Sequence, residues 1–557
     1  MAYEDILAAV DAVRLMDSVR AICTGERLSN EAEVRSVDVL EKLFTDAGCR
    51  VTREALPGYV STPEGAAFEA GGIAYEVLTH PMTPSADGLE ADLVYVPVDR
   101  TGSASAEEVS GRIVLTDGLA MEPVVRALED RGAAGVVFIT GEEIHNMIVS
   151  RVWGSPTPET LHDYVGIPVA SLSFGDGSRL RARLSEAGGT LPARLSTRVE
   201  SRWTEIPVIT AEIRGADEDF VMVTGHVDSW GLGALDNASG NACAVELARI
   251  LAPLASDMRR SVRFVLWSGH SHGRYAGSTA WCDAHFEELE RHCLLNVNSD
   301  CLGGRGATVM TESPAMASTR GLARTALREA AGVTDWRGCR FSRSCDQSFW
   351  GAGVPSIFSQ VSEQPPFEGA AADAFGKMFG SGRTGGFGAW WHTRTDTPDK
   401  LDPENLARDV RVFASVLAHA LFDERLPVDA AAEVLELRDE LKAWQEKAGD
   451  SLDLSEVLAR LDLLAEALKA AARSDDPKRF EKRSRRVLSE IIPLAYVEGS
   501  VYSHDEALRA PPVPMLRLVD ELATLSGHER NAALVSLRRV VNRLKAGAAR
   551  ALDVARA

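Results

Sequence analysis

The sequence lacks the features that mark membrane-spanning, secreted and disulfide-stabilised proteins. It has no run of about 18 uninterrupted apolar residues, which a membrane-spanning helix needs. Its eight cysteines are scattered without a C-x-x-C pair, a distribution that favours reduced, buried thiols over a disulfide framework. The N-terminal segment lacks the basic and continuous apolar regions of a secretory signal. We therefore expect a cytoplasmic protein without membrane contact.

Positive charge is also scarce. The chain has 60 lysines and arginines against 81 acidic residues, a formal net charge of -21. Phosphate backbones are repelled by such a surface, so we expect no nucleic-acid partner. Hydrophobic residues make up 45% and charged residues 25% of the chain, which is typical of folded proteins. A chain of 557 residues is longer than a single hydrophobic core usually accommodates, so we expect several domains.

The pattern of predicted secondary structure changes twice along the chain and divides it into three regions. A helix that starts at Ser29 or Asn30 and stops at Gly48 opens an α/β pattern. The segment 59–202 has short strands and frequent turns, and after it buried strands alternate with helices. This alternation predicts a mostly parallel mixed sheet with helices on both faces. We expect a discontinuous α/β domain at 1–58 and 203–425, a β-rich insert at 59–202 and a helical domain at 426–557, whose apolar face includes Leu454, Val457, Leu458, Leu461, Leu464 and Leu468.

Polar side chains follow the predicted strands of the α/β part at the points where those strands end. Ligands gather at the carboxyl ends of strands in α/β sheets. Imidazole nitrogens and carboxylate oxygens are the ligands that zinc and other first-row metal ions accept. The residues in these positions are His226, Asp228, Asp236, His270, His272, Asp300 and His392.

Each of these residues alone has an ordinary structural explanation. A single histidine at a strand end is more often a hydrogen-bonded structural residue, and an aspartate beside Asn and Gly, such as Asp236, usually belongs to a turn. Several imidazoles and carboxylates at neighbouring strand ends favour a metal site instead. In such a site Asp236 can bridge two ions about 3.5–4 Å apart.

The chain closely resembles the dinuclear zinc aminopeptidase and glutamate carboxypeptidase superfamily, which includes aminopeptidase Y and the transferrin receptor. The motifs that carry the resemblance are "GHVDSWGLGALDNASG", "NVNSDCLGG" and "WWHTRTDTPDKLD". It covers roughly 1–58 and 203–425 and implies the zinc-peptidase fold. The β-rich insert resembles the protease-associated domain of several members. A C-terminal helical domain completes the layout of the glutamate carboxypeptidase branch and implies a homodimer.

The resemblance also implies roles for individual residues. His226 and Asp300 bind one metal ion, Asp236 bridges, and His392 binds the second ion. Asp228 matches the acid that orients the general base. Asp346, in "SRSCDQSFWGAGVPS", lies in a motif near the substrate pocket, although a helix N-cap is an equally good explanation for this residue.

The chain departs from the family at "WSGHSHGRYAGST", residues 267–279. Family members have a Glu-Glu pair there, the first glutamate as general base and the second as a ligand of the second metal. Counting from Trp267 places His270 and Ser271 at the pair, whereas counting back from Gly277 places Ser271 and His272 there. Serine is a poor ligand for a divalent ion. We expect His272 as the ligand and His270 as the catalytic base, with the exchanged assignment left open.

The predicted cofactor is a divalent metal, foremost Zn²⁺, in one or two ions per chain, with Mn, Fe, Co and Ni also compatible. A neutral imidazole in place of a glutamate makes the centre more positive and lowers the pKa of a bound water further. For the substrate we expect contacts from Arg274, Tyr275, Arg343 and Asp346, although Arg274 fits a surface ion pair as well.

Three functions are compatible with these residues. The first is a metal-dependent hydrolase of peptide or amide bonds, aminopeptidase-like or carboxypeptidase-like, that acts on a small peptide, amide or amino-acid derivative. The second is a lyase acting on a small carboxylate or amino-acid derivative at the same centre. The third is a binding protein without catalysis. The third explains least well why the four remaining metal-ligand positions keep metal-binding residues.

Overall fold

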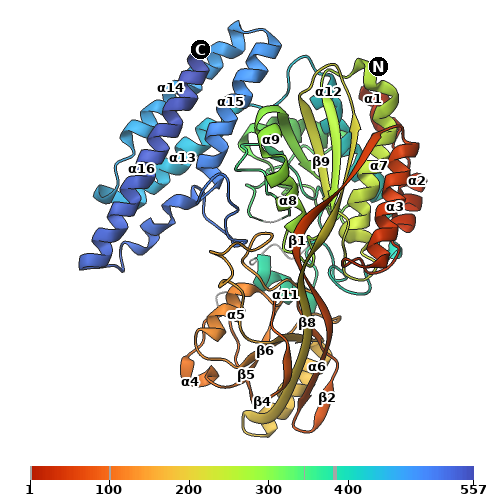
Figure 1. Cartoon of the computed structure of the whole chain (residues 1–557), viewed down its shortest axis with the longest axis vertical. Coiled ribbons are helices and arrows are strands. Elements are labelled where there is room, and N and C mark those ends of the chain that lie inside the picture. The colour runs from red at the N-terminus through yellow and green to blue at the C-terminus, as the bar shows by residue number, and fades with distance from the viewer. Residues whose placement is uncertain (1–2, 100–101, 344, 380–385) are drawn as a thin grey trace.

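The computed structural model describes residues 3–99, 102–343, 345–379 and 386–557. These residues form three parts, which are visible in Figure 1. In this view an α/β part lies at the upper right, a β-rich part lies below it, and a group of long helices lies at the upper left. The predicted fold class is confirmed: a mixed sheet carries helices on both faces.

The α/β part contains the N-terminal helices and the segments that follow the β-rich part. The N-cap predicted for its third helix is confirmed, since the Asn30 side chain accepts a hydrogen bond from the Glu33 amide. Its helices are α1 (Tyr3–Ala8), α2 (Ala12–Ile22), α3 (Glu31–Asp46), α7 (Ser239–Leu251), α8 (Ala276–Ala284), α9 (Phe286–His292), α10 (Arg320–Ala331), α11 (Ala370–Phe379) and α12 (Pro403–Phe422), with short helical turns at Ala234–Ala238, Ala252–Asp257, Ala317–Thr319 and Pro398–Lys400. Its strands are β1 (Arg50–Ala70), β8 (Thr190–Ile213), β9 (Phe220–His226), β10 (Ser261–Trp267), β11 (Cys293–Asn298) and β12 (Ser356–Ile357).

The central strands of this sheet are buried on both faces. In β9, Val221 and Val223 belong to the core that includes α7, whereas Phe220 and Met222 pack with residues of α8 and α9 on the other face. This alternation is what a strand between two helical layers requires. Strands β12, β11, β9 and β10 run parallel in that order, and β8 closes this side antiparallel to β10.

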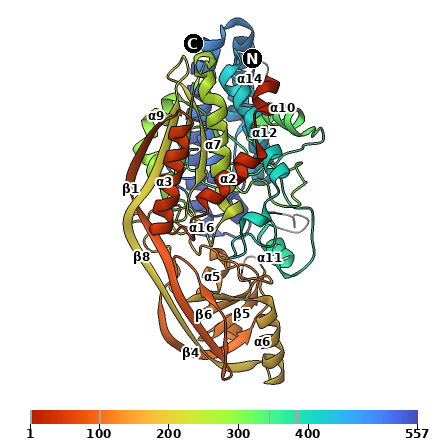
Figure 2. The ribbon, with the colours of Figure 1, turned by 90° about the vertical axis from the view of Figure 1, so that its right-hand side faces the viewer.

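The β-rich part is joined to the α/β part by two strands that run through both. Figure 2 shows β1 and β8 descending together from one part into the other. They pair antiparallel from Arg50 opposite Glu212 to Ala70 opposite Ala193, so the backbone crosses the predicted boundaries at 58/59 and 202/203 inside regular strands. The other elements are β2 (Ile73–Tyr75), β3 (Leu78–Thr79), β4 (Ala86–Tyr95), α4 (Ala106–Val109), β5 (Ile113–Asp117), α5 (Glu122–Glu129), β6 (Gly135–Ile139), β7 (Val169–Leu172) and α6 (Phe174–Glu186).

The C-terminal part consists of helices that pack on one another and on the α/β part. The predicted apolar face is buried at Leu454, Val457, Leu461, Leu464 and Leu468. The Arg485 guanidinium is buried and donates to the carbonyl oxygens of Leu289, Ala352 and Gly353 in the α/β part. The elements are α13 (Ala430–Ala448), α14 (Ser455–Ser474), α15 (Pro477–Tyr496) and α16 (Gly527–Arg556), with short turns at Gly449–Ser451 and Pro514–Glu521.

The structure also bears on the expectations about membrane helices and disulfides. Among the described residues, no helix is both long enough and apolar enough to cross a membrane. All eight cysteines lie in the described part of the chain, and none of them forms a disulfide.

Candidate metal centre

The carboxyl ends of three parallel strands bring the candidate ligands together. His226, the last residue of β9, pairs in register with Trp267, the last residue of β10. In β11, Asn298 pairs with Thr224 of β9. The chain segments that leave these strands therefore begin at one edge of the sheet, and they carry His226, His270 and Asp300.

The His226 side chain is held in one orientation. Its Nδ1 lies 2.9 Å from the carbonyl oxygen of Asp228, so the Nδ1–H donates and Nε2 keeps its lone pair. Nε2 lies 3.0 Å from Asp236 Oδ1 and 3.6 Å from Asp300 Oδ1. Burial lowers the pKa of His226, whereas the nearby carboxylates of Asp228, Asp236 and Asp300 raise it well above its ordinary value; a cation bound at Nε2 would displace the proton that these carboxylates favour.

The three atoms that converge here fit a divalent cation. His226 Nε2, Asp236 Oδ1 and Asp300 Oδ1 are all buried, and none has a hydrogen-bond partner among the described residues. Buried polar atoms without partners are costly, and an imidazole lone pair that faces two carboxylate oxygens is a donor set typical of zinc. A cation between these atoms would satisfy all three.

Asp236 also faces the second candidate ligand. Its Oδ2 lies 3.1 Å from His392 Nε2, so its two oxygens point to two different histidines. His392 Nδ1 lies 2.8 Å from the carbonyl oxygen of Asn146, which belongs to the β-rich part. The geometry is that of a bridging carboxylate, and the β-rich part fixes the ring on one side of the bridge.

Two residues without a sequence-based assignment position the Asp236 loop. Asp396 accepts hydrogen bonds from the Leu235 and Asp236 amides at 2.8 and 3.0 Å, and burial raises the pKa of Asp396 to about 7. Arg27 is completely buried and donates to the carbonyl oxygens of Val227, Leu232 and Gly233. The loop between His226 and Asp236 is thereby held by side chains from distant parts of the chain.

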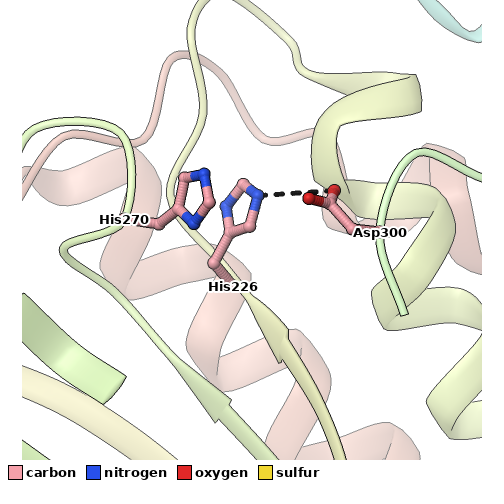
Figure 3. Close-up of side chains that lie close together, drawn as sticks. All are labelled: His226, His270 and Asp300. Atoms are coloured by element: carbon pink, nitrogen blue, oxygen red, sulfur yellow. Dashed lines mark ion pairs between the residues drawn. The ribbon is translucent and has the colours of Figure 1, made fainter. Parts of the chain in front are cut away.

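His270 lies beside this cluster. Figure 3 shows its ring parallel to that of His226; the centroids are 3.8 Å apart and the planes differ by 9°. Ligand atoms of His226, His270 and Asp300 lie within 4.8 Å of one another. His270 Nδ1 lies 2.6 Å from Asp346 Oδ2, so Asp346 contacts a histidine of the site. The position predicted for the catalytic base is therefore next to the metal cluster.

His272 points elsewhere. Its Nδ1 lies 3.0 Å from Asp228 Oδ2 and its Nε2 lies 2.7 Å from Ser29 Oγ. Both ring nitrogens are thus engaged outside the two potential metal-binding groups found in the described residues. The geometry does not favour the ligand role expected of His272, and it places His270 rather than His272 beside the candidate ligands. Asp228 holds the backbone of His270 through the amide rather than the ring.

The arginines expected at the substrate are engaged with the C-terminal part. Arg274 donates to the carbonyl oxygen of Ala507, and Arg343 pairs with Asp505 at 2.9 Å. Tyr275 contacts the site more directly, since its ring lies edge-on to His270 with centroids 4.9 Å apart. On its other side Tyr275 packs against Trp153 of the β-rich part, at 4.3 Å between centroids.

A surface pocket lies beside Trp153, one member of this aromatic pair. Its lining includes Trp153 from the β-rich part, Gln347 and Trp350 from the α/β part, and Val501 and Tyr502 from the C-terminal part. Gln347 directly follows Asp346, the partner of His270. All three parts of the chain therefore meet next to the histidine cluster.

Cys301 is a further residue of the cluster that had no predicted role. Its sulfur lies within 4.8 Å of ligand atoms of Asp236 and Asp300. Burial and these two carboxylates raise the pKa of its thiol well above the ordinary value. Cys301 is therefore a close neighbour of the candidate donor set.

Comparison with known proteins agrees with this geometry. Residues 208–417 match the model of Peptidase family M28. The chain is 23% identical to aminopeptidase YwaD of Bacillus subtilis over 396 residues, which cover 70% of this chain and 75% of that protein. It is 24% identical to a glutamate carboxypeptidase 2 homologue of Caenorhabditis elegans, where the match spans 43% of this chain and only 32% of the relative.

Solved structures share the fold. A zinc aminopeptidase from Bacillus subtilis has a TM-score of 0.56 at 18% identity, with 75% of this chain and 98% of that chain covered. A Peptidase M28 precursor from Shewanella amazonensis has a TM-score of 0.57 at 21% identity, with 74% and 94% covered. The buried donor set lies within the matched segment. Residues 208–417 thus resemble Peptidase family M28, and this match together with the aminopeptidase relatives supports a metal-dependent peptidase.

Proposed function

We propose that this protein is a zinc-dependent hydrolase of peptide or amide bonds with a histidine in place of the usual glutamate base. The observation that carries the proposal is the convergence of three buried ligand atoms without hydrogen-bond partners, on His226, Asp236 and Asp300, inside a segment of Peptidase family M28. The lyase and binding hypotheses are not favoured, since the matched relatives are named aminopeptidases and carboxypeptidases.

His226, Asp236 and Asp300 would hold the ion. When bound, it supplies Lewis acidity that lowers the pKa of a water molecule and polarises a carbonyl oxygen. The protein's part is to fix the ligands. Asp228 orients His226 through its carbonyl oxygen, and Asp396 fixes the backbone of Asp236.

His270 is the proton acceptor in this proposal. The Asp346 carboxylate accepts a hydrogen bond from Nδ1, which leaves the Nε2 lone pair available for a proton. The ring stacks on His226, so the accepting nitrogen stays beside the ion-binding residues. After water has attacked the carbonyl carbon of the substrate, the same nitrogen can return the proton to the leaving amine.

A second ion would have fewer ligands. Asp236 Oδ2 and His392 Nε2 face each other, and Ser271 stands where the Glu-Glu motif would supply another ligand. With His272 directed to Asp228 and Ser29, we propose one tightly bound ion at His226 and a weaker site at His392.

The remaining assignments are part of the same proposal. We infer that the β-rich part acts as a protease-associated insert, because it holds His392 and contributes Trp153 to the pocket. The helical part contributes the other pocket wall, and a homodimer through its helices and a cytoplasmic location stay predictions. The substrate is a small peptide, amide or amino-acid derivative.

Metal analysis and a substrate panel test the proposal. The purified protein is stripped with a chelator, reconstituted with zinc, manganese or cobalt, and assayed on aminoacyl amides, dipeptides and N-acyl amino acids. We expect turnover only after reconstitution. Bound zinc without turnover of any amide would move the assignment to another reaction, and a protein that binds no metal would exclude the proposed site.

A further inference from the structure

We propose that Ser29, His272 and Asp228 form a second hydrolytic centre in which Ser29 is the nucleophile, and that its substrates are esters of small apolar acyl groups. None of these three residues belongs to the proposed metal ligands, and His272 has no role in the proposed metal site.

The three side chains form a hydrogen-bonded line. Ser29 Oγ lies 2.7 Å from His272 Nε2, and His272 Nδ1 lies 3.0 Å from Asp228 Oδ2. Because the carboxylate accepts from Nδ1–H, Nε2 is the acceptor for the serine hydroxyl proton. Nucleophile, base and orienting acid in this sequence, at these distances, are the arrangement of serine hydrolases.

The acid of this line is fixed by hydrogen bonds to each of its two oxygens. These oxygens accept from the amides of His270 at 3.1 Å and Ser271 at 2.5 Å. A carboxylate held behind Nδ1–H in this way orients the ring and stabilises the imidazolium that forms when Nε2 takes a proton.

Ser29 is placed for attack. His272 and Asp228 are completely buried, whereas Ser29 keeps part of its surface exposed, so a ligand reaches the line at the serine. Ser29 has φ 53°, a left-handed conformation that is strained for a residue with a side chain and that clusters at functional sites. It precedes Asn30, the N-cap of α3.

The surroundings of Ser29 indicate the class of substrate. The preceding residue, Leu28, packs in an apolar cluster with Met82, Ile148 and Trp230. The indole Nε1 of Trp230 is buried and has no hydrogen-bond partner among the described residues. Apolar side chains next to the serine suit a small apolar acyl group. The Ser29 amide is unavailable to the carbonyl oxygen of such a group, since it donates to Glu33.

The proposed reaction is acyl transfer to Ser29 followed by hydrolysis. Ser29 Oγ forms a bond to the ester carbonyl carbon while its proton passes to His272 Nε2. The bond from the acyl carbon to the leaving oxygen then breaks, and that oxygen takes the proton. Water, deprotonated by the same nitrogen, releases the acid and restores the hydroxyl of Ser29.

Labelling with an alkyl fluorophosphonate tests the proposal in the full-length protein. The modified serine is mapped by peptide mass spectrometry, in both metal-loaded and chelator-treated samples. We expect modification at Ser29 in both. Ser29→Ala removes it, and His272→Ala slows it by roughly 10³-fold or more. Ser455→Ala, which changes an exposed serine of α14, serves as the matched control and labels at Ser29 at the wild-type rate.

A second measurement uses p-nitrophenyl acetate and butyrate as substrates. Chelator-treated wild-type protein and the Ser455→Ala variant should release p-nitrophenol, whereas Ser29→Ala should not exceed the background rate. Circular dichroism of each variant establishes that it is folded. The proposal is overturned if Ser29 stays unmodified while a reference serine esterase is labelled, or if folded His272→Ala is labelled as fast as the wild type.

Discussion

His270 Nδ1 and Asp346 Oδ2 lie 2.6 Å apart, although the two residues are 76 positions apart in the chain. Asp346 had been predicted as a substrate contact or a helix cap. In the structure it fixes the tautomer and the ring plane of the histidine that stacks on His226. We propose that this imidazole and carboxylate act together as the base, in place of the glutamate that the family resemblance implies at this position.

Replacement of this pair should separate catalysis from metal binding. We expect His270→Ala to lower kcat for peptide hydrolysis by about 10²–10⁴-fold, the usual contribution of a general base, with zinc content unchanged. Asp346→Asn should lower kcat less, because the imidazole remains but loses its orienting acceptor. Zinc content is measured by mass spectrometry alongside kcat. If His270→Ala loses the zinc, His270 is a ligand and the base lies elsewhere.

His226 and His272 should differ in their contribution to metal binding. His226→Ala removes the imidazole whose Nε2 faces both Asp236 and Asp300, so we expect it to abolish tight zinc binding. His272→Ala should keep its zinc, because both ring nitrogens are bonded to other residues. Titration against a fluorescent chelator gives both affinities, and an equal loss in the two variants would contradict the assignment.

The buried guanidinium of Arg27 should be essential for the loop that carries Asp236. Arg27→Lys cannot reach the three carbonyl oxygens that the guanidinium serves. Loss of these bonds should cost about 2–4 kcal/mol of unfolding free energy and weaken zinc binding. Urea unfolding and zinc titration measure the two effects. Arg20→Lys, at an exposed ion pair, is the control and should change neither; unchanged stability in Arg27→Lys would argue against the positioning role.

Glu433 should make stability depend on pH. It is buried where α13 meets the α/β part, accepts hydrogen bonds from Ser318, and burial raises its pKa to about 7. The folded state therefore holds a proton that the unfolded state releases near pH 4.5, so stability falls as pH rises from about 4.5 to about 7.

We expect Glu433→Gln to remove this fall, on the order of 3 kcal/mol for a fully buried carboxyl. Urea unfolding at pH 5 and pH 8 compares the variant with the wild type, and Glu446→Gln, at an exposed position of α13, is the control. A variant with the same pH dependence as the wild type would show that another group is responsible.

Much of the fold was predictable because its signals are local. The alternation of Val221 and Val223 with Phe220 and Met222 follows from the residues of one strand, and the N-cap at Asn30 from the first turn of one helix. Strand ends also placed His226 and Asp300 at one sheet edge. These features depend on few neighbours in the sequence.

Other features depend on distant parts of the chain. Counting residues along the motif could not decide between His270 and His272 as the metal ligand. The two rings are distinguished only by their partners in space, which are Asp346 for His270, and Asp228 and Ser29 for His272. Arg27 and Asp396 have no local motif that links them to the site. The strands β1 and β8 cross the predicted domain boundaries because their pairing extends through both parts, which composition does not reveal.

The central claim is that an ion held by His226, Asp236 and Asp300 is required for amide hydrolysis. The most direct measurement is the initial rate of dipeptide and aminoacyl-amide hydrolysis as zinc is titrated into chelator-stripped protein. We predict a rate that starts at background and rises steeply as the first equivalent of zinc binds, and no such rise in His226→Ala. A rate that does not respond to zinc, or zinc bound at these residues with every amide left intact, would contradict the account.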